Sequence, residues 1–224
     1  MSQTTFQLFA KAPVAGTVKT RLCPPLSAED AAVLYMRMIE HAALVVHAAC
    51  ARLAKAGSVV KAELWCAPDT THPALRLVAG HYGFALRRQA DGDLGAKMSA
   101  ALESAMPGSA ILIGSDAPAL DTDRLVAAAD ALTSHDAVVV PADDGGYGLI
   151  GCRGQVPHCF SSIRWSTPTV MEETRVRLDA TGLSWTALPP VWDVDTAADL
   201  LRLAADPRLS QLFDGIKTAV AAAA

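Results

Sequence analysis

This sequence of 224 residues contains few aromatic residues (5%), few charged residues (19%) and five scattered cysteines without a C-x-x-C pair. Its six histidines do not form the H-E-x-x-H pattern of zinc hydrolases. An odd number of unclustered cysteines argues against a disulfide framework or a thiolate zinc site. It is typical of free thiols in a reducing compartment.

Long apolar runs and broad positive charge are also lacking. No apolar run approaches the ~20 residues of a membrane helix, and the first residues do not resemble a signal peptide. We therefore expect a soluble, cytoplasmic protein without a membrane span. The net charge of −4 argues against a nucleic-acid-binding surface. Without repeats or linkers, the simplest organisation is one domain over residues 1–206, followed by an alanine-rich helix or frayed tail over 207–224.

Hydrophobic residues make up 51% of the chain, and strand-like and helix-like segments alternate along it. Strands are predicted over residues 6–9, 59–65, 84–87, 110–114, 137–140, 148–152 and 185–188. Helices are predicted over residues 28–56, 71–81, 94–105, 121–132, 167–178 and 196–205. This order predicts a single α/β domain with a mainly parallel sheet flanked by helices.

The loop after the first predicted strand concentrates positive charge. It carries Lys11, Gly16, Lys19 and Arg21 and has no acidic residue. Lysine and arginine suit phosphate oxygens, so the loop is a candidate cradle for a polyphosphate; a solvated basic loop is the simpler alternative. Val18 stands where a Walker A motif needs glycine, and one glycine is too few for a G-x-G-x-x-G fingerprint.

Acidic residues follow three of the later predicted strands. Asp116, Asp144 and the pair Asp193 and Asp195 each come shortly after such a strand. In parallel sheets ligands bind at the carboxyl ends of the strands, where these carboxylates would meet. Ionised aspartates are costly to bury unpaired. Mg²⁺ or Mn²⁺ would resolve this conflict and leave coordination positions for substrate phosphates, so the pattern predicts a divalent metal site beside the basic loop.

Each of these acidic positions also has a purely structural explanation. Asp116 before Ala-Pro fits a turn, and so does the stretch Asp143–Gly146. Asp195 or Thr196 fits the N-cap of the last predicted helix. The residues alone leave both readings open at every position.

Six motifs occur in an order that resembles one family. They are FAKAPVAGTVKTRL, GDLGAKM, IGSDAPAL, PADDGGYGLIG, WSTPTV and DVDTAADL, and they extend over residues 6–200. Together they are similar to bacterial GT-A-type proteins described provisionally as glycosyltransferases or nucleotide-diphospho-sugar transferases. A more distant similarity extends to the molybdenum-cofactor and phospholactate guanylyltransferases. The resemblance implies a Rossmann-like, nucleotide-binding sheet with a small antiparallel extension.

The resemblance also implies roles on the nucleotide side of the site. Lys11, Lys19 and Arg21 would face the phosphates, with Gly16 in the same loop. The turn Asp91-Gly92-Asp93 would lie near the base or ribose, with helix capping as the alternative role of Asp93.

On the acidic side, the resemblance implies a metal held by Asp116 and Asp195, with Asp193 as a further candidate ligand. Asp144 would act as a general base toward an acceptor hydroxyl. The glycines Gly145 and Gly146, together with Tyr147, would line the second-substrate side; Tyr147 covering the edge of the core is the alternative.

Trp165, Ser166 and Thr167 are further candidates for a contact with a sugar. Trp165 offers a stacking surface, but Ser166 or Thr167 as an N-cap, with a proline in the first turn, predicts the start of a helix here.

The chain departs from both activities that the resemblance suggests. Nucleotidyltransferases have several glycines where this loop has Gly16, and many glycosyltransferases have D-x-D where this chain has Ser115-Asp116-Ala117. We expect a metal-dependent glycosyltransferase-like enzyme that binds a nucleotide-diphospho-sugar and a small-molecule acceptor. The alternatives are a nucleotidyltransferase that joins an NTP to a phosphorylated small molecule, and a nucleotide-binding module without turnover.

Overall fold

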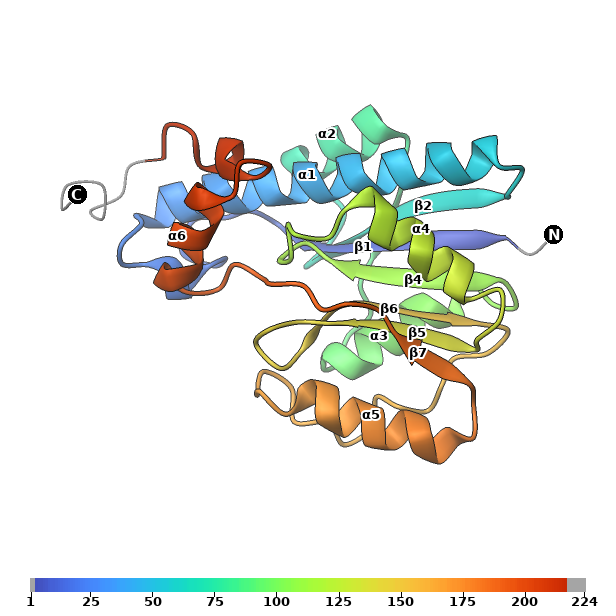
Figure 1. Ribbon diagram of the computed structural model, residues 1–224. Helices are drawn as coiled ribbons and strands as arrows, with labels where there is room; N and C mark the ends of the chain where they lie inside the picture. The colour runs from blue at the N-terminus through green and yellow to red at the C-terminus, as the bar shows by residue number, and fades with distance from the viewer. Residues whose placement is uncertain (1–2, 217–224) are drawn as a thin grey trace.

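The structure, a computed structural model, describes residues 3–216, and a seven-stranded sheet forms the centre of this part of the chain (Figure 1). The strands are β1 (Thr4–Lys11), β2 (Val60–Ala67), β3 (Ala85–Arg88), β4 (Ser109–Gly114), β5 (Ala137–Pro141), β6 (Tyr147–Arg153) and β7 (Trp185–Ala187). They lie in the order β3-β2-β1-β4-β6-β5-β7, and all pairs are parallel except those of β6. The predicted mainly parallel sheet is confirmed.

The antiparallel part of the fold is β6, which lies inside the sheet between β4 and β5. It is therefore an integral strand and not an extension beside the sheet. Because β6 runs in the opposite direction, its first residue, Tyr147, pairs with the last residue of β5, Pro141. The loop between these strands consequently lies at the edge where the parallel strands end.

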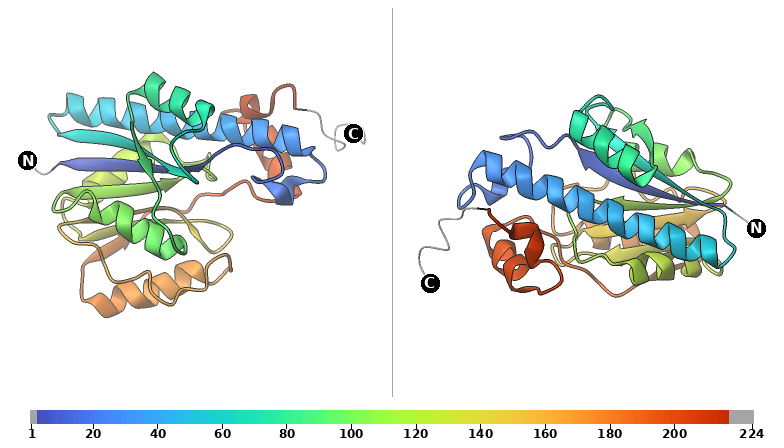
Figure 2. Two further views of the ribbon diagram at one scale, coloured as in Figure 1. Left: turned by 180° about the vertical axis from the view of Figure 1, so that it is seen from behind. Right: turned by 90° about the horizontal axis from the view of Figure 1, so that it is seen from above.

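Helices cover both faces of the sheet (Figures 1 and 2). The helices are α1 (Ala28–Lys55), α2 (Pro73–Tyr82), α3 (Leu94–Glu103), α4 (Thr122–Ala131), α5 (Val170–Thr181) and α6 (Ala197–Ala205), with 3-10 turns η1 (Thr20–Leu22) and η2 (Ser210–Phe213). Helices α1, α2 and α4 cover one face and α3 and α5 the other, while α6 lies beyond the carboxyl ends of the strands. Each face buries its own apolar cluster, so the sheet is covered on both sides as predicted for residues 110–114.

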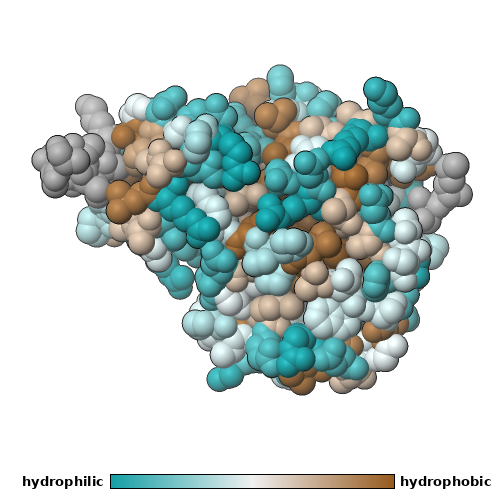
Figure 3. All heavy atoms as spheres, viewed as in Figure 1, coloured by the Kyte–Doolittle hydropathy of each residue, from teal (hydrophilic) through white to brown (hydrophobic). Residues whose placement is uncertain are grey.

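Helix α1 is long and apolar enough, by length and composition alone, to cross a membrane. In the fold it instead supplies one face of the core, because Leu34, Met38, Ile39 and Val46 are fully buried against the sheet side of the domain. Its start matches the sequence prediction, since the Ser27 hydroxyl accepts a hydrogen bond from the Asp30 N–H at 3.0 Å. Over the face drawn in Figure 3, hydrophobic residues are interspersed with hydrophilic ones.

The segment after α6 contributes to the same core. Leu209, Leu212 and Ile216 are buried in the cluster formed by α1 and its neighbours, and η2 lies within this segment. Buried residues of this one apolar cluster therefore lie both before and after residue 206, where the sequence predicts the end of the domain. The remainder of the expected alanine-rich tail, residues 217–224, lies outside the described residues.

Candidate active site

The candidate site lies where the strand order reverses direction. β1 pairs in parallel with β2 on one side and with β4 on the other, so the chain leaves the carboxyl end of β1 toward one side and reaches β4 on the other. Crevices that bind ligands in α/β sheets form at such points. The loop that follows β1 and the loop that follows β4 therefore meet at this edge.

The basic loop follows β1, and its cationic side chains differ in their exposure to solvent. Lys11, the last residue of β1, is exposed, and Arg21 in η1 is 69% exposed at its side chain. Gly16 has a φ of 76°, a conformation that favours glycine. Lys11 and Arg21 are thus accessible to solvent at the predicted phosphate side, and Arg21 Nη1 also lies 3.9 Å from Asp195 Oδ2.

Lys19, in contrast, turns inward. Its side chain is only 5% exposed, and its Nζ lies 2.6 Å from Asp116 Oδ1 and 2.8 Å from Asp195 Oδ1. It also donates to the Val194 carbonyl oxygen at 2.7 Å. Burial lowers the pKa of Lys19, but Asp116 and Asp195 more than offset this and raise it above its ordinary value. The ammonium is therefore charged and joins the end of β4 to the segment before α6.

The four predicted acidic residues converge on this edge. One carboxylate oxygen from each of Asp144, Asp193 and Asp195 lies within 4.8 Å of the others, and Asp195 shares Lys19 with Asp116. Burial, followed by the charges of Asp144 and Asp195, raises the pKa of Asp193 to about 6. Oxygen-only donor sets of this kind suit Mg²⁺ or Mn²⁺, so the residues present fit the predicted metal.

The structural alternatives for these aspartates are partly realised. Asp144 Oδ1 accepts a hydrogen bond from the Gly146 N–H at 2.7 Å, as expected of a turn. The cap of α6 is Thr196, whose N–H and hydroxyl both donate to Asp199 at 2.7 Å. The Asp195 carboxylate takes no part in that cap and is directed at Lys19 instead.

Gly145 holds the acidic loop tightly against a second segment. It has a φ of 88°, and a Cβ atom there would lie 2.0 Å from the Pro168 carbonyl oxygen. The Met171 N–H also donates to the Gly145 carbonyl at 2.7 Å. The Asp144 loop is consequently packed on the segment that begins α5.

The start of α5 differs from the sequence prediction. Its N-cap residue is Thr169, not Ser166 or Thr167, and Thr169 makes no capping hydrogen bond. Ser166 adopts a φ of 63°, and the Thr167 hydroxyl donates to the Arg164 carbonyl at 2.7 Å. The predicted cap at Ser166 or Thr167 is therefore wrong, because these residues complete an irregular turn before the helix starts.

The turn predicted near the nucleoside has its own local partners. Asp93 caps α3 by accepting from the Ala96 N–H at 2.8 Å, and Asp91 pairs with Arg88 at 2.7 Å. Gly92 between them has a φ of 106°. Within residues 3–216, no hydrogen bond or ion pair joins this turn to the cluster of Asp144, Asp193 and Asp195.

Tyr147 and Trp165 pack against the core on the α3 side. The Tyr147 hydroxyl lies 3.8 Å from Met98 Sδ, and burial, together with Cys159, raises its pKa. Trp165 lies beside Gly95, where a Cβ atom would come 2.8 Å from the tryptophan ring. Both rings thus pack on the α3-side apolar cluster.

Sequence reasoning missed two residues that organise this edge, Tyr35 and Ser115. The Tyr35 hydroxyl accepts from the Lys11 N–H at 3.0 Å and shares a hydrogen bond of 2.9 Å with the Ser115 hydroxyl. It therefore links the ends of β1 and β4. Burial and the Asp116 charge raise its pKa to about 12. Tyr35 lies on the core face of α1, so its position in the sequence gives no signal of this role.

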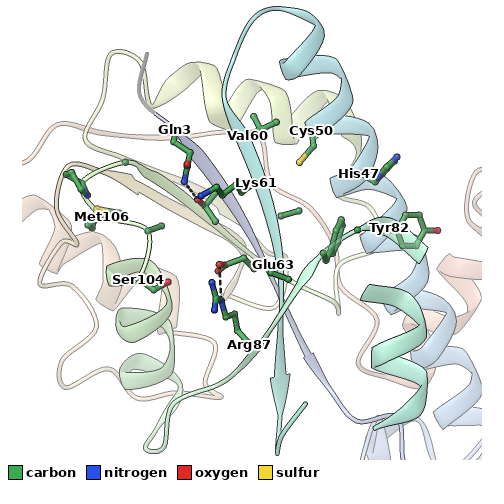
Figure 4. A pocket seen from close by; sticks show the side chains of 18 residues that line it. Gln3, His47, Cys50, Val60, Lys61, Glu63, Tyr82, Arg87, Ser104 and Met106 are labelled. Carbon is green, nitrogen blue, oxygen red and sulfur yellow. Dashed lines mark hydrogen bonds and ion pairs between the residues drawn. The ribbon is translucent and has the colours of Figure 1, made fainter. Parts of the chain in front are cut away.

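A pocket of about 1010 Å³ lies elsewhere (Figure 4). It is lined by the first residues of β1 and β2, the turn before β3 and the segment after α3. Glu63 and Arg87 point toward one another there, with Arg87 Nε 3.1 Å from Glu63 Oε1. The predicted site residues are absent from its lining, so the cavity is separate from the candidate active site.

Several solved structures share this fold. A protein of Desulfovibrio desulfuricans G20, described provisionally as a nucleotide-diphospho-sugar transferase, is 26% identical with a TM-score of 0.78, over 98% of this chain and 94% of that one. Two further structures are similar in fold alone. A CMP:2-keto-3-deoxy-manno-octonic acid synthetase in complex with CTP is 13% identical with a TM-score of 0.57, over 94% of this chain and 99% of that one. A 4-diphosphocytidyl-2C-methyl-D-erythritol synthase of Anaerococcus prevotii DSM 20548 is 9% identical with a TM-score of 0.53, over 90% and 96%.

The chain therefore has the fold of the D. desulfuricans protein, and this fold is shared with the two synthetases. Residues 46–167 match a family described as an uncharacterized protein conserved in bacteria (DUF2064), and the chain belongs to this family. A search of the curated proteins found no match. The matched segment contains Asp116 and Asp144, whereas Lys19 and Asp195 lie outside it.

Proposed function

We propose that this chain is a metal-dependent glycosyltransferase-like enzyme that takes a nucleotide-diphospho-sugar as donor and a small molecule as acceptor. The observation that carries the proposal is the convergence of Asp144, Asp193 and Asp195, with ligand oxygens within 4.8 Å, beside a loop of exposed cations. The similarity to the D. desulfuricans protein supports the type of donor.

The cluster of aspartates is the proposed site of Mg²⁺ or Mn²⁺. Asp116 and Asp195 would hold the ion, with Asp193 as a further candidate ligand. A bound divalent ion would neutralise charge on the departing nucleotide diphosphate. The raised pKa of Asp193 fits this role, because a carboxylate crowded by burial and like charges is stabilised by a cation.

The remaining roles belong to the chain's own side chains. Lys11 and Arg21, both exposed, would bind the diphosphate and orient it. The turn Asp91–Asp93 would contact the base or ribose. These contacts hold the donor in place while its bond to the sugar breaks.

The acceptor would bind on the side of the Asp144 loop. Asp144 is exposed, and as a general base it would take the proton of the acceptor hydroxyl. Gly145 and Gly146 allow close approach to the backbone, and Tyr147 supports this wall. We also propose a cytoplasmic location, because the five cysteines are all free thiols.

Nucleotidyl transfer is the second candidate, and the shared fold with a CTP-bound synthetase favours it. The same edge would then hold an NTP. A phosphorylated small molecule would attack the α-phosphate, and pyrophosphate would leave.

A thermal-shift screen followed by product analysis separates these functions. NTPs, NDPs and nucleotide-sugars are each added with and without Mg²⁺ or Mn²⁺, since a ligand of the folded state raises the melting temperature. We expect a metal-dependent shift with nucleotide-sugars and release of a nucleoside diphosphate. Asp195→Asn should lose the shift, whereas Asp130→Asn, an exposed position on α4, should keep it.

The other outcomes each decide the question. Pyrophosphate released from an NTP, without turnover of any nucleotide-sugar, would replace the first function with the second. A shift without any product would identify a binding module. If no nucleotide shifts the melting temperature, the proposed site itself is wrong.

A further inference from the structure

The ammonium group of Lys19 has no donor left for a substrate. A lysine ammonium carries three N–H donors. Here they face Asp116 Oδ1 at 2.6 Å, Asp195 Oδ1 at 2.8 Å and the Val194 carbonyl oxygen at 2.7 Å. In this arrangement Lys19 cannot bind a phosphate as well, although the sequence predicts that it faces the phosphates.

Lys19 lies beneath the two carboxylates that it joins. Its side chain is 5% exposed, whereas those of Asp116 and Asp195 are 53% and 36% exposed. The outer sides of the carboxylates thus face solvent and their inner sides face the single buried ammonium, while the exposed Arg21 Nη1 lies 3.9 Å from Asp195 Oδ2. A divalent ion approaching from solvent would meet carboxylates that already have a counter-charge.

The backbone of Lys19 is fixed, so any change must come from its side chain. Lys19 has φ 48° and ψ 36°, the left-handed conformation that non-glycine residues rarely adopt. Its neighbours Val18 and Leu22 are buried, and the Leu22 N–H donates to the Lys19 carbonyl at 2.9 Å. The backbone contacts therefore hold this strained conformation, so an exchange of partners by the ammonium would need only side-chain rotation.

We propose that Lys19 is the resident counter-cation of the pair Asp116 and Asp195, and that it gives up one of them when a metal-bound diphosphate enters. Phosphate oxygens accept charge-assisted hydrogen bonds, so they replace the lost carboxylate as the partner of Lys19. The released carboxylate then faces the divalent ion. The inference rests on the proposed function, since it requires that a divalent ion and a diphosphate share this site.

The consequence is a coupling between two ligands. Without a diphosphate, the Lys19 charge opposes binding of the divalent ion. With a diphosphate, that opposition falls, so each ligand raises the affinity of the other by the same factor. A lysine that only ties two loops together would add nothing to the coupling that contact between the ion and the diphosphate itself produces.

Mn²⁺ binding to the full-length chain tests the proposal without relying on turnover. Free Mn²⁺ is measured by electron paramagnetic resonance, with and without inorganic pyrophosphate, and protein-free samples correct for the Mn²⁺–pyrophosphate complex. In the parent protein we expect pyrophosphate to tighten Mn²⁺ binding at least tenfold. Lys19→Met should bind Mn²⁺ alone at least tenfold more tightly than the parent and should lose most of the effect of pyrophosphate.

Lys61→Met is the matched control, because it removes the same charge from an exposed position on β2. It should leave Mn²⁺ binding within twofold of the parent. Folding of each variant is checked by circular dichroism. If Lys19→Met does not fold, Lys19→Gln, which retains an N–H donor for the Val194 carbonyl, carries the same prediction.

The outcomes distinguish this inference from the proposed function. Mn²⁺ affinity that is unchanged in both Lys19 variants, in a parent that binds Mn²⁺ and pyrophosphate together, overturns the role of Lys19 alone. Equal Mn²⁺ affinity of the parent with and without pyrophosphate overturns it as well. If the parent binds neither probe, the metal-dependent function fails and the inference with it.

Discussion

Two polar networks in this molecule differ in how far their carboxylates are paired with donors of the protein itself. Beside the large cavity, Glu63 accepts hydrogen bonds from Trp65 Nε1 at 2.8 Å and Arg87 Nε at 3.1 Å. In the candidate active site, Lys19 is shared by two carboxylates, and no ion pair is found for Asp144 or Asp193 within residues 3–216.

The difference separates a network that supports the fold from one that awaits a ligand. Glu63 meets its donors within the protein, so the fold alone satisfies it. The negative charge of the clustered aspartates of the candidate site exceeds the positive charge of the neighbouring side chains. A bound cation would balance this excess. Disrupting the first network should lower stability, and disrupting the second should lower ligand binding.

The largest expected effect is on ligand binding at the aspartate cluster of the candidate active site. Asp195→Asn keeps the shape of the side chain but removes the charge that Lys19 and the metal share. We expect metal-dependent turnover to fall by about a hundredfold or more. The ligand-free variant should also be less stable, because the buried Lys19 ammonium keeps only one of its two carboxylate partners. Turnover of the variant within threefold of the parent, measured under saturating metal, would place the metal elsewhere.

The two ends of β6 provide the next comparison. Gly145→Ala, before β6, should lower the free energy of unfolding by about 2–4 kcal/mol, because φ is 88° and the new Cβ would meet the Pro168 carbonyl. Gly154→Ala, after β6, has a similar φ of 72° but open space around it, so about 1 kcal/mol is expected. Urea unfolding of both variants measures the difference. Equal losses would show that the contact with Pro168 is unimportant.

Breaking the network around Glu63 should reduce stability and spare the site. Glu63→Leu leaves the buried Trp65 N–H without its acceptor and removes the partner of Arg87, at a cost of about 2 kcal/mol. The metal-dependent response to nucleotides should persist in the folded variant. Arg88→Ala, which removes an exposed ion pair with Asp91, should cost under about 1 kcal/mol. Loss of the nucleotide response in Glu63→Leu would mean that the two networks are linked.

The smallest expected effects concern pH. The folded pKa of Asp193, about 6, exceeds that of the unfolded chain, so this carboxyl destabilises the fold increasingly as pH rises from about 4 to 6. Asp193→Asn should therefore be more stable than the parent above pH 6, by about 1 kcal/mol because solvent screens a half-buried group, and equally stable below pH 4.

Asp136 near the opposite edge has the reverse sign. Hydrogen bonds from Ser184 hold its pKa below the ordinary value, so its contribution to stability is present at neutral pH and is lost as pH falls through the folded pKa. Asp136→Asn should thus be less stable than the parent at pH 7, with a difference that shrinks in acid. Unfolding curves from pH 3 to 8 compare both variants, and differences of the same sign would contradict the assignment.

Much of the fold is predictable from local patterns. The apolar run Ala110–Gly114, the Ser27 cap and the alternation of strands with helices all correspond to elements of the structure. The direction and position of β6 are not predictable in this way. The sequence of a short apolar strand does not indicate whether the strand is parallel or antiparallel to its neighbours. Its orientation is fixed only by its pairing with β4 and β5.

The site is predictable in composition but not in connectivity. Asp116, Asp144 and Asp195 follow strands, which indicates a common edge. The inward turn of Lys19 depends on its left-handed backbone and on residues 175 positions later, to which no local rule refers. Tyr35 is hidden for a similar reason, because its hydroxyl acts at the site while its ring packs in the core.

The buried ammonium also has a consequence for the order in which the protein is made. Lys19 and the first of its carboxylates, Asp116, leave the ribosome well before Asp195 and the segment after α6 that packs at Leu209 and Leu212. A nascent chain with a folded sheet therefore carries this lysine with half of its counter-charge. The ion cluster is therefore completed only after the segment that carries Asp195 has been made.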